Sequence, residues 1–161
     1  MGRLRLILSG LTRTVRELRT LPLGDWCLFT RAWWEVVFVR VGLGLGPLRR
    51  RLLAAPGAGT DRPCPVPPSP QLLDVFAAAV RSQPVPPLCL PRSLALSRLL
   101  LSRGVPTRLC LGLRKNGGDL EGHAWLDWDA GIVAEPDTLV RQLVRLEWGG
   151  QPAPSQRMRE A

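Results

Sequence analysis

The first third of the chain places apolar residues at the three- and four-residue intervals of helices. The predicted helices cover residues 4–21, 25–40 and 48–55. Pro22 and Gly24 end the first helix, and Asp25 is a suitable N-cap for the second. Glycines and a proline within residues 42–47 predict a break before the third helix.

A segment rich in proline and glycine follows these helices. Residues 56–70 hold six prolines and two glycines, a composition that sustains neither a helix nor a central strand. We therefore expect four regions along the chain. They are a basic helical region over residues 1–55, a linker over 56–70, a core over 71–150 and a polar tail over 151–161.

The core begins with two predicted helices. The first covers residues 71–82 and turns Leu72, Val75, Phe76 and Val80 inward. The second opens at Cys89, after a turn made of three prolines and a valine, and runs to about Arg103, where Gly104 closes it. Cys89 is therefore predicted at a helix N-terminus.

Beyond Pro106 the apolar period changes to two. Leu109, Leu111 and Leu113 alternate with small or polar residues, which predicts a strand. Further strands are predicted over residues 123–128 and 132–135, with turns at 116–118 and 129–131 and a last helix over 138–148. The predicted fold class is α+β, with helices packed on an antiparallel sheet.

Positive charge is concentrated at the start of the chain. The formal net charge is +9, and residues 1–55 contribute ten arginines against three acidic residues. No nucleic-acid-binding motif accompanies this charge, so we predict a solvated or partner-facing helical surface and no nucleic acid.

The longest apolar stretch, residues 26–45, contains Arg31, Glu35 and Arg40, which argues against a membrane span. An interfacial helix remains an alternative interpretation. It would make peripheral membrane contact through Trp33, Trp34, Val37 and Phe38.

The chain has four cysteines, Cys27, Cys64, Cys89 and Cys110. Their spacing contains no CxxC pair and no metal-ligand pattern, so neither a zinc site nor any other cofactor is expected. The first residues lack the pattern of a signal peptide, and we expect reduced thiols in a cytoplasm.

Cys89 and His123 are the candidate nucleophile and general base. A helix N-terminus favours a thiolate through its macrodipole and its free N–H groups. His123 is the single histidine of the chain and is predicted at the start of a strand. A cysteine on a helix followed by a histidine on a strand is the arrangement of papain-like and transglutaminase-like sites. Cys27 and Cys110 fall within a predicted helix and strand, and Cys64 falls in the linker.

A third group is expected to orient the imidazole. The candidates are Asp127, Asp129, Glu135 and Asp137. A three-residue loop over 129–131 would place Glu135 diagonal to His123, at roughly 7–8 Å between backbones, and would place Asp137 directly opposite it. A two-residue loop would turn Glu135 to the other face. Asp127 lies about 13 Å from His123 along its own strand, which is too far for a direct bond.

Three short motifs give the second half of the chain a family resemblance. They are Cys-Leu-Pro-Arg-Ser-Leu-Ala-Leu at 89–96, Gly-Val-Pro-Thr-Arg-Leu at 104–109 and His-Ala-Trp-Leu at 123–126. In combination they resemble the transglutaminase-like leader peptidases of lasso-peptide biosynthesis, in the stand-alone form without a leader-recognition domain. The resemblance implies a Cys–His–acid triad whose acid follows the histidine by a dozen residues and lies beside a proline. Glu135, before Pro136, stands where that family usually has Asp.

The resemblance also implies a function and partners. A thiol peptidase of this family removes the leader of a ribosomally made precursor, before a separate ATP-using cyclase closes the new N-terminus. The precursor leader, a separate recognition protein and the cyclase would be the partners. The alternatives are an acyl transferase of the same fold and a non-catalytic adaptor that binds a membrane or a protein through its basic helices.

Overall fold

A computed structural model describes residues 15, 19, 21–54, 67–128 and 131–146 of the chain. Its elements are η1 (Leu23–Asp25), α2 (Trp26–Gly44), α3 (Gly46–Ala54), α4 (Pro70–Arg81), α5 (Cys89–Leu101), β1 (Arg108–Asn116), β2 (Asp119–Trp128), β3 (Gly131–Val133), α6 (Asp137–Val140) and β4 (Val144–Leu146). Most of the predicted helix over 4–21 and of the predicted linker over 56–70 lies outside the described residues. Their predicted boundaries stay predictions.

Helix α2 is longer than the sequence predicts. It continues to Gly44, and α3 begins at Gly46, so only Leu45 separates them. Gly42 lies within α2 and does not end it. Its lack of a side chain instead allows residues of α3 to pack closely against it. A Cβ at this position would lie 2.7 Å from Leu52 Cδ1 and 2.9 Å from Leu48 Cδ2. The missing side chain therefore lets α3 pack directly on α2.

The start of α2 is fixed by a contact with α4. Asp25 occupies the predicted N-cap position, but its side chain makes no capping hydrogen bond. Its Oδ1 instead accepts a hydrogen bond of 2.7 Å from Gln71 Nε2. Since Asp25 is buried, this bond satisfies a polar group that would otherwise be costly to bury.

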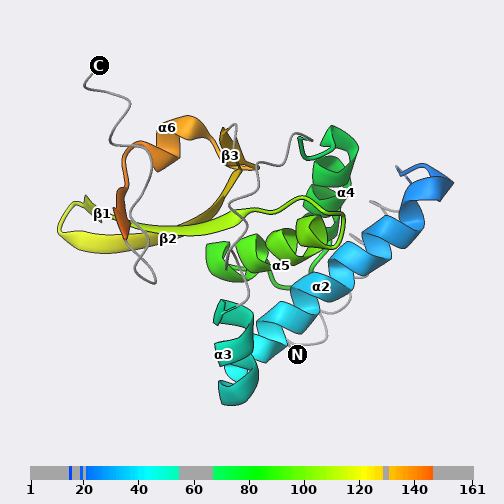
Figure 1. Cartoon of the computed structure of the whole chain (residues 1–161), viewed down its shortest axis with the longest axis horizontal. Helices are drawn as coiled ribbons and strands as arrows, with labels where there is room; N and C mark the ends of the chain where they lie inside the picture. Colours follow the sequence, from blue (N-terminus) through cyan, green and yellow to red (C-terminus); the bar gives the residue numbers. More distant parts are fainter. Residues whose placement is uncertain (1–14, 16–18, 20, 55–66, 129–130, 147–161) are drawn as a thin grey trace, which may run out of the picture.

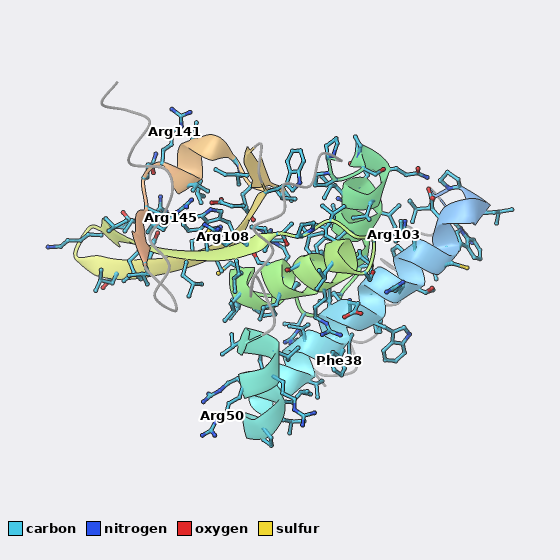
Figure 2. All side chains as sticks on the ribbon, viewed as in Figure 1. Phe38, Arg50, Arg103, Arg108, Arg141 and Arg145 are labelled. Atoms are coloured by element: carbon cyan, nitrogen blue, oxygen red, sulfur yellow. The ribbon has the colours of Figure 1, made fainter. Side chains whose placement is uncertain are left out.

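The two faces of α2 have different surroundings. Phe29, Ala32, Val36 and Val39 are buried in the main core with α4 and α5. On another face of α2, Trp34 is 64% exposed and Phe38, labelled beside this helix in Figure 2, is 44% exposed. The guanidinium of Arg98 lies over the Phe38 ring, 5.1 Å from its centroid. Trp33 and Val37, which the interfacial alternative included, are half-buried. None of the described helices is both long enough and apolar enough to cross a bilayer.

The sheet separates two groups of packed side chains. Its order is β3-β2-β1-β4, and every pairing is antiparallel. Leu126 joins the main core with α2, α4 and α5, whereas its neighbour Trp125 packs with Cys110 and Val140 in a smaller cluster. Figure 1 shows α5 and α6 on opposite sides of the sheet. The α+β class with a helix-covered antiparallel sheet is confirmed.

The predicted helix over 138–148 is wrong. Residues 137–140 form one short helical turn, and Val144–Leu146 then form β4 along the free edge of β1. The unpaired N–H and C=O groups of an edge strand favour such an addition. Leu143, between the two elements, packs in the smaller cluster. Tertiary pairing thus overrides the helical spacing of this segment.

Strand β2 begins at Asp119, earlier than predicted. Gly117 and Gly118 have φ of 61° and 120°, which permits a tight connection from β1 and lets pairing continue to Asn116↔Asp119. His123 therefore lies in the middle of β2 and not at its start. Pairing with β1 continues through the residues before and after His123, which orders the backbone that carries the imidazole.

Gly112 provides the first test of the packing. It lies opposite His123, and a Cβ there would be 2.9 Å from Leu143 Cβ and from the Trp125 ring. We expect Gly112→Ala to lower the free energy of unfolding by about 1–3 kcal/mol, because backbone and an aromatic ring must shift. Urea denaturation measures this difference.

Gly122→Ala is the matched control. Gly122 is on the adjacent strand, and its added Cβ would meet only Leu113 Cδ2, at 3.5 Å. We expect a change in the free energy of unfolding within about 0.5 kcal/mol. Equal losses for the two alanine variants would contradict the packing described for Gly112.

Candidate active site

Cys89 is the first residue of α5. Leu88 occupies the N-cap position with extended backbone and no side-chain cap, and the N–H of Arg92 makes the first helical bond, 3.2 Å to the Leu88 carbonyl. The N–H groups of a first helical turn have no carbonyl in a preceding turn, and Pro91 has no N–H. The free donors at Cys89 and Leu90 favour negative charge at this end of the helix. The Cys89 side chain is partly exposed and can be reached by a substrate.

Cys110 is a poorer nucleophile than Cys89. Cys110 is buried in β1, and burial, followed by the charge of Asp127, raises the pKa of its thiol to about 12. Cys110 therefore stays protonated at neutral pH, and only a thiolate attacks efficiently. Cys27 is exposed on α2, and Cys64 lies outside the described residues.

His123 is a partly buried imidazole in a positively charged environment. Its side chain is 21% exposed. Burial is the main cause that lowers the pKa of His123, and the positive charges of Arg92 and Arg114 lower it further. The imidazole is therefore neutral at neutral pH and is able to accept a proton.

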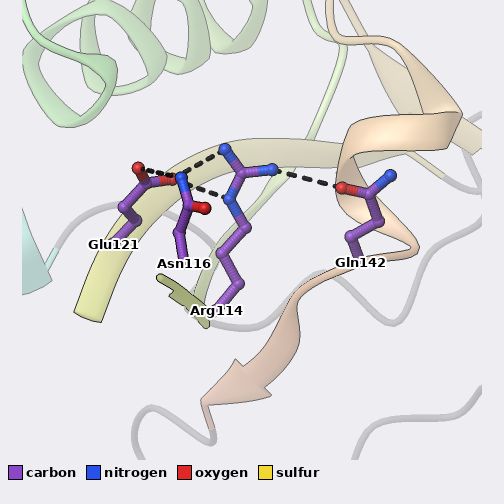
Figure 3. Close-up of polar contacts among 4 residues, drawn as sticks. All are labelled: Arg114, Asn116, Glu121 and Gln142. Atoms are coloured by element: carbon purple, nitrogen blue, oxygen red, sulfur yellow. Dashed lines mark hydrogen bonds and ion pairs between the residues drawn. The ribbon is translucent and has the colours of Figure 1, made fainter. Parts of the chain in front are cut away.

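The Arg114 guanidinium is held in place by neighbouring polar groups. Its Nε and Nη2 lie 2.7 and 2.6 Å from Glu121 Oε2, and its Nη1 donates to Gln142 Oε1 at 3.2 Å (Figure 3). Asn116 Nδ2 donates to the second oxygen of Glu121 at 2.9 Å. These bonds orient a cation from β1 on the sheet face that carries His123.

The predicted three-residue loop between β2 and β3 is wrong. Trp128 pairs with Gly131, so two residues lie between the paired positions, and β3 ends at Val133. The predicted pairing of His123 with Asp137 is therefore absent, and Asp137 is the first residue of α6. Side chains of a strand alternate between the two faces of a sheet. If β3 continued to residue 135 in this register, Glu135 would lie on the face opposite His123.

Glu135 nevertheless reaches His123, because the strand does not continue. Ala134 has φ of 60°, the left-handed conformation, and this residue redirects the chain immediately before Glu135. Glu135 Oε2 lies 3.5 Å from His123 Nε2. The distance is within ion-pair range, and the contact becomes an ion pair when the imidazole is protonated. Among the described residues the buried Nε2 has no hydrogen-bond partner. The carboxylate is thus adjacent to the imidazole and can tighten onto it when substrate excludes water.

Arg92 joins Glu135 to the helix that carries Cys89. Its Nη2 forms an ion pair with Glu135 Oε1, and the Glu135 side chain is 10% exposed. Arg92 follows Cys89 by three residues, so both lie on the same side of α5. One carboxylate therefore contacts the histidine through one oxygen and the cysteine helix through the other.

A second contact fixes the first turns of α5 against β2. Ser93 Oγ donates a buried hydrogen bond of 2.9 Å to the carbonyl of Ala124, the residue after His123. In the described part of the sheet, β3 pairs with residues 126–128 and leaves this edge of β2 open at Ala124. Ser93 follows Cys89 by one helical turn. The N-terminus of α5 therefore lies at the open edge of the sheet, beside the histidine position.

Asp127 is bound elsewhere. It shares the sheet face of His123, but its Oδ1 accepts a 2.9 Å hydrogen bond from Trp125 Nε1 and its Oδ2 pairs with Arg145 at 2.8 Å. Arg145 also lies over the Trp125 ring, 5.3 Å from its centroid. Asp127 thus stabilises the smaller cluster. Asp129 lies outside the described residues.

Two polar residues of this site were not predicted from the sequence. Arg92 and Ser93 stand three and four residues after Cys89, which is the spacing of neighbours on one helix face. That spacing from a candidate nucleophile was the available signal. The sequence did not reveal which groups they would contact, because Glu135 and Ala124 lie in segments that are distant along the chain.

Comparison with known proteins identifies the family of the chain. No curated protein and no solved structure matches the chain. A family model described as Transglutaminase-like superfamily matches residues 32–147, which is more than half of the chain and includes Cys89, His123 and Glu135. This family typically consists of cysteine-dependent enzymes. The chain belongs to the transglutaminase-like superfamily.

Proposed function

We propose that this protein is a cysteine peptidase that removes the leader from a lasso-peptide precursor. The observation that carries the peptidase proposal is the double contact of Glu135, with His123 and with Arg92 on the Cys89 helix. It brings a base, an acid and the helix of the nucleophile into one connected group. Membership of a family of cysteine-dependent enzymes supports this assignment.

The chemistry divides among three side chains. Cys89 Sγ attacks the carbonyl carbon of the last leader peptide bond, and His123 accepts the thiol proton. His123 then gives that proton to the departing amine of the core peptide, which leaves the leader bound to sulfur as a thioester. Water, deprotonated by His123, hydrolyses the thioester and restores the thiol.

Glu135 keeps the imidazole in the productive orientation. Because Nε2 faces Glu135, Nδ1 is the nitrogen that we assign to the exchange with Cys89. The carboxylate also stabilises the imidazolium that forms when the proton is taken. The N–H of Cys89, free at the start of α5, is the expected donor to the developing oxyanion.

The precursor and the partners are proposed from the family resemblance. The motifs at 89–96, 104–109 and 123–126 support a leader peptidase that acts with a separate recognition protein and before a separate cyclase. A cytoplasmic site of action is proposed from the cysteine spacing and the lack of a signal-peptide pattern, on which the prediction of reduced thiols rests. The exposed Trp34 and Phe38 support a contact of α2 with a partner protein or a membrane surface.

Cys89→Ala tests the nucleophile. We expect no detectable leader removal from a candidate precursor supplied with its recognition protein, with an unchanged melting temperature. Mass spectrometry of the products measures this, and a product containing an added amine would identify acyl transfer instead of hydrolysis. Cys27→Ala is the control. It replaces an exposed cysteine that is distant from Cys89 in the sequence, and this variant should cleave the precursor normally. Near-normal cleavage by Cys89→Ala would refute the assignment.

Glu135→Gln tests the acid. We expect kcat to fall by about 10²–10⁴-fold, as for other triads in which an amide replaces the carboxylate. Asp127→Asn is the control and should change kcat only a few-fold, because Asp127 is bound to Trp125 and Arg145. If Asp137→Asn abolished turnover while Glu135→Gln was tolerated, Asp137 would be the acid.

Removal of the recognition protein tests the proposed partner. The isolated chain is expected to cleave its precursor slowly, because binding of the leader supplies local concentration and orientation. Rates measured with and without that protein, at fixed precursor concentration, give the comparison. Equal rates would show that the chain recognises the leader alone.

A further inference from the structure

The ion pair between Arg92 and Glu135 has a largely buried carboxylate whose two oxygens contact different side chains. Glu135 is 10% exposed and Arg92 is 35% exposed, so the carboxylate is largely removed from water while the guanidinium reaches it from the helix. The two carboxylate oxygens have different neighbours, since Oε1 contacts Arg92 and Oε2 lies 3.5 Å from His123 Nε2.

We propose that Arg92 is a positioning residue that holds the Glu135 carboxylate against His123. It also connects the helix of Cys89 to the segment that follows β3. The proposal rests on the proposed function and deepens it. Arg92 does not contact the reacting atoms in this scheme. It acts through Glu135, and its effect is on the orientation and charge of the imidazole.

The geometry gives a reason why this chain needs such a residue. Glu135 follows a strand that has ended, on a segment redirected by the positive φ of Ala134, so no sheet pairing fixes its side chain. Glu has one more rotatable side-chain bond than Asp, and each such bond must be ordered to hold the carboxylate. A planar guanidinium that binds one oxygen restricts the other oxygen to the side facing His123.

The charges around His123 give the proposal a second consequence. Glu135 faces the imidazole from the segment after β3, Arg92 from α5 and Arg114 from β1. Arg145 of β4 and Asp127 of β2 are paired with each other. Loss of the Arg92 charge removes one of the two cations, with Arg114 remaining, and releases Glu135 from its ion pair, so that the full charge of the carboxylate acts on His123. Both changes favour the imidazolium, so the pKa of His123 rises.

The chain offers a matched control on the same helix. Arg98 of α5 pairs with Glu35 of α2 at 2.9 Å, and its side chain is 38% exposed, close to the exposure of Arg92. This second Arg–Glu pair also joins α5 to another element, but neither residue lies in the candidate site. Arg98→Gln therefore removes an equivalent ion pair without changing the charge near His123.

The first experiment compares the kinetics of Arg92→Gln and Arg98→Gln. Arg92→Gln is expected to lower kcat by about 10²-fold, with KM for the precursor within about twofold, because misorientation affects the chemical step more than leader binding. Arg98→Gln should leave both constants within about twofold. Arg92→Lys should recover part of kcat, since it restores the charge but not the fork of donors. Equal kinetics for Arg92→Gln and Arg98→Gln would overturn the proposal.

The second experiment is independent of substrate. His123 is the only histidine of the chain, so its Hε1 proton gives a single histidine Hε1 resonance that can be titrated in the full chain carrying Cys89→Ala. Adding Arg92→Gln should raise the pKa of His123 by about half a unit or more, whereas adding Arg98→Gln should not move it. Arg92→Lys should keep the original value, because it keeps the charge. If Arg92→Gln does not fold, the positioning role is tested by the kcat of Arg92→Lys, which should stay below that of Arg98→Lys, and equal kcat values for these two variants would overturn it.

The two experiments separate the failure of this inference from failure of the proposed function. If no candidate precursor is cleaved by the wild-type protein, the peptidase proposal fails while the titration still measures the influence of Arg92. If cleavage is normal and Arg92→Gln neither lowers kcat nor moves the titration, the ion pair is only structural and the positioning role is wrong.

Discussion

Burial of α5 is the constraint on which the rest of the structure depends. Leu94, Leu99 and Leu100 of this helix have no exposed surface, and they pack in the core that also contains side chains of α2, α4 and β2. Each buried leucine contributes about 1.5–3 kcal/mol relative to an exposed one. The position of α5 is therefore set by side chains remote from its first turn, and Cys89 stands on a rigid support.

The other half of the site depends on how β2 is paired. β1 pairs with residues 119–127 of β2, whereas β3 pairs only with residues 126–128, and this difference leaves an open edge at the level of Ala124. The open edge accepts Ser93, and the chain that leaves β3 returns Glu135 to His123. A short third strand is thus what lets the cysteine helix, the histidine strand and the acid converge. Arg92 then connects two of the three.

The sequence predicts the regular parts of this arrangement well. Alternation at Leu109, Leu111 and Leu113 identified β1, and the apolar spacing of residues 71–82 identified α4. The last segment was misread, because three residues of edge strand carry too little pattern to compete with helical spacing. Gly42 was interpreted as a break, whereas its lack of a side chain permits the contact of α3 with α2.

The approach of Glu135 to His123 depended on features that the sequence hides. In the observed register, a continued β3 would place Glu135 on the sheet face opposite His123. The positive φ of Ala134 redirects the chain, and Glu135 reaches His123. Few residues other than glycine adopt that conformation, so nothing in an alanine predicts it. Glu135 was predicted near His123 both from the family resemblance and from an incorrect register, and its partner Arg92 was visible only once the distant elements were placed together.

The central claim is that Cys89 carries the leader as a thioester during turnover. Rapid acid quenching of the protein with excess precursor and its recognition protein, followed by intact mass and peptide mapping, measures this directly. The account predicts an added mass equal to the leader less one water, located on the peptide that contains Cys89. Leader removal that persists at full rate after Cys89 has been completely alkylated, or an acyl group on a different residue, would contradict it.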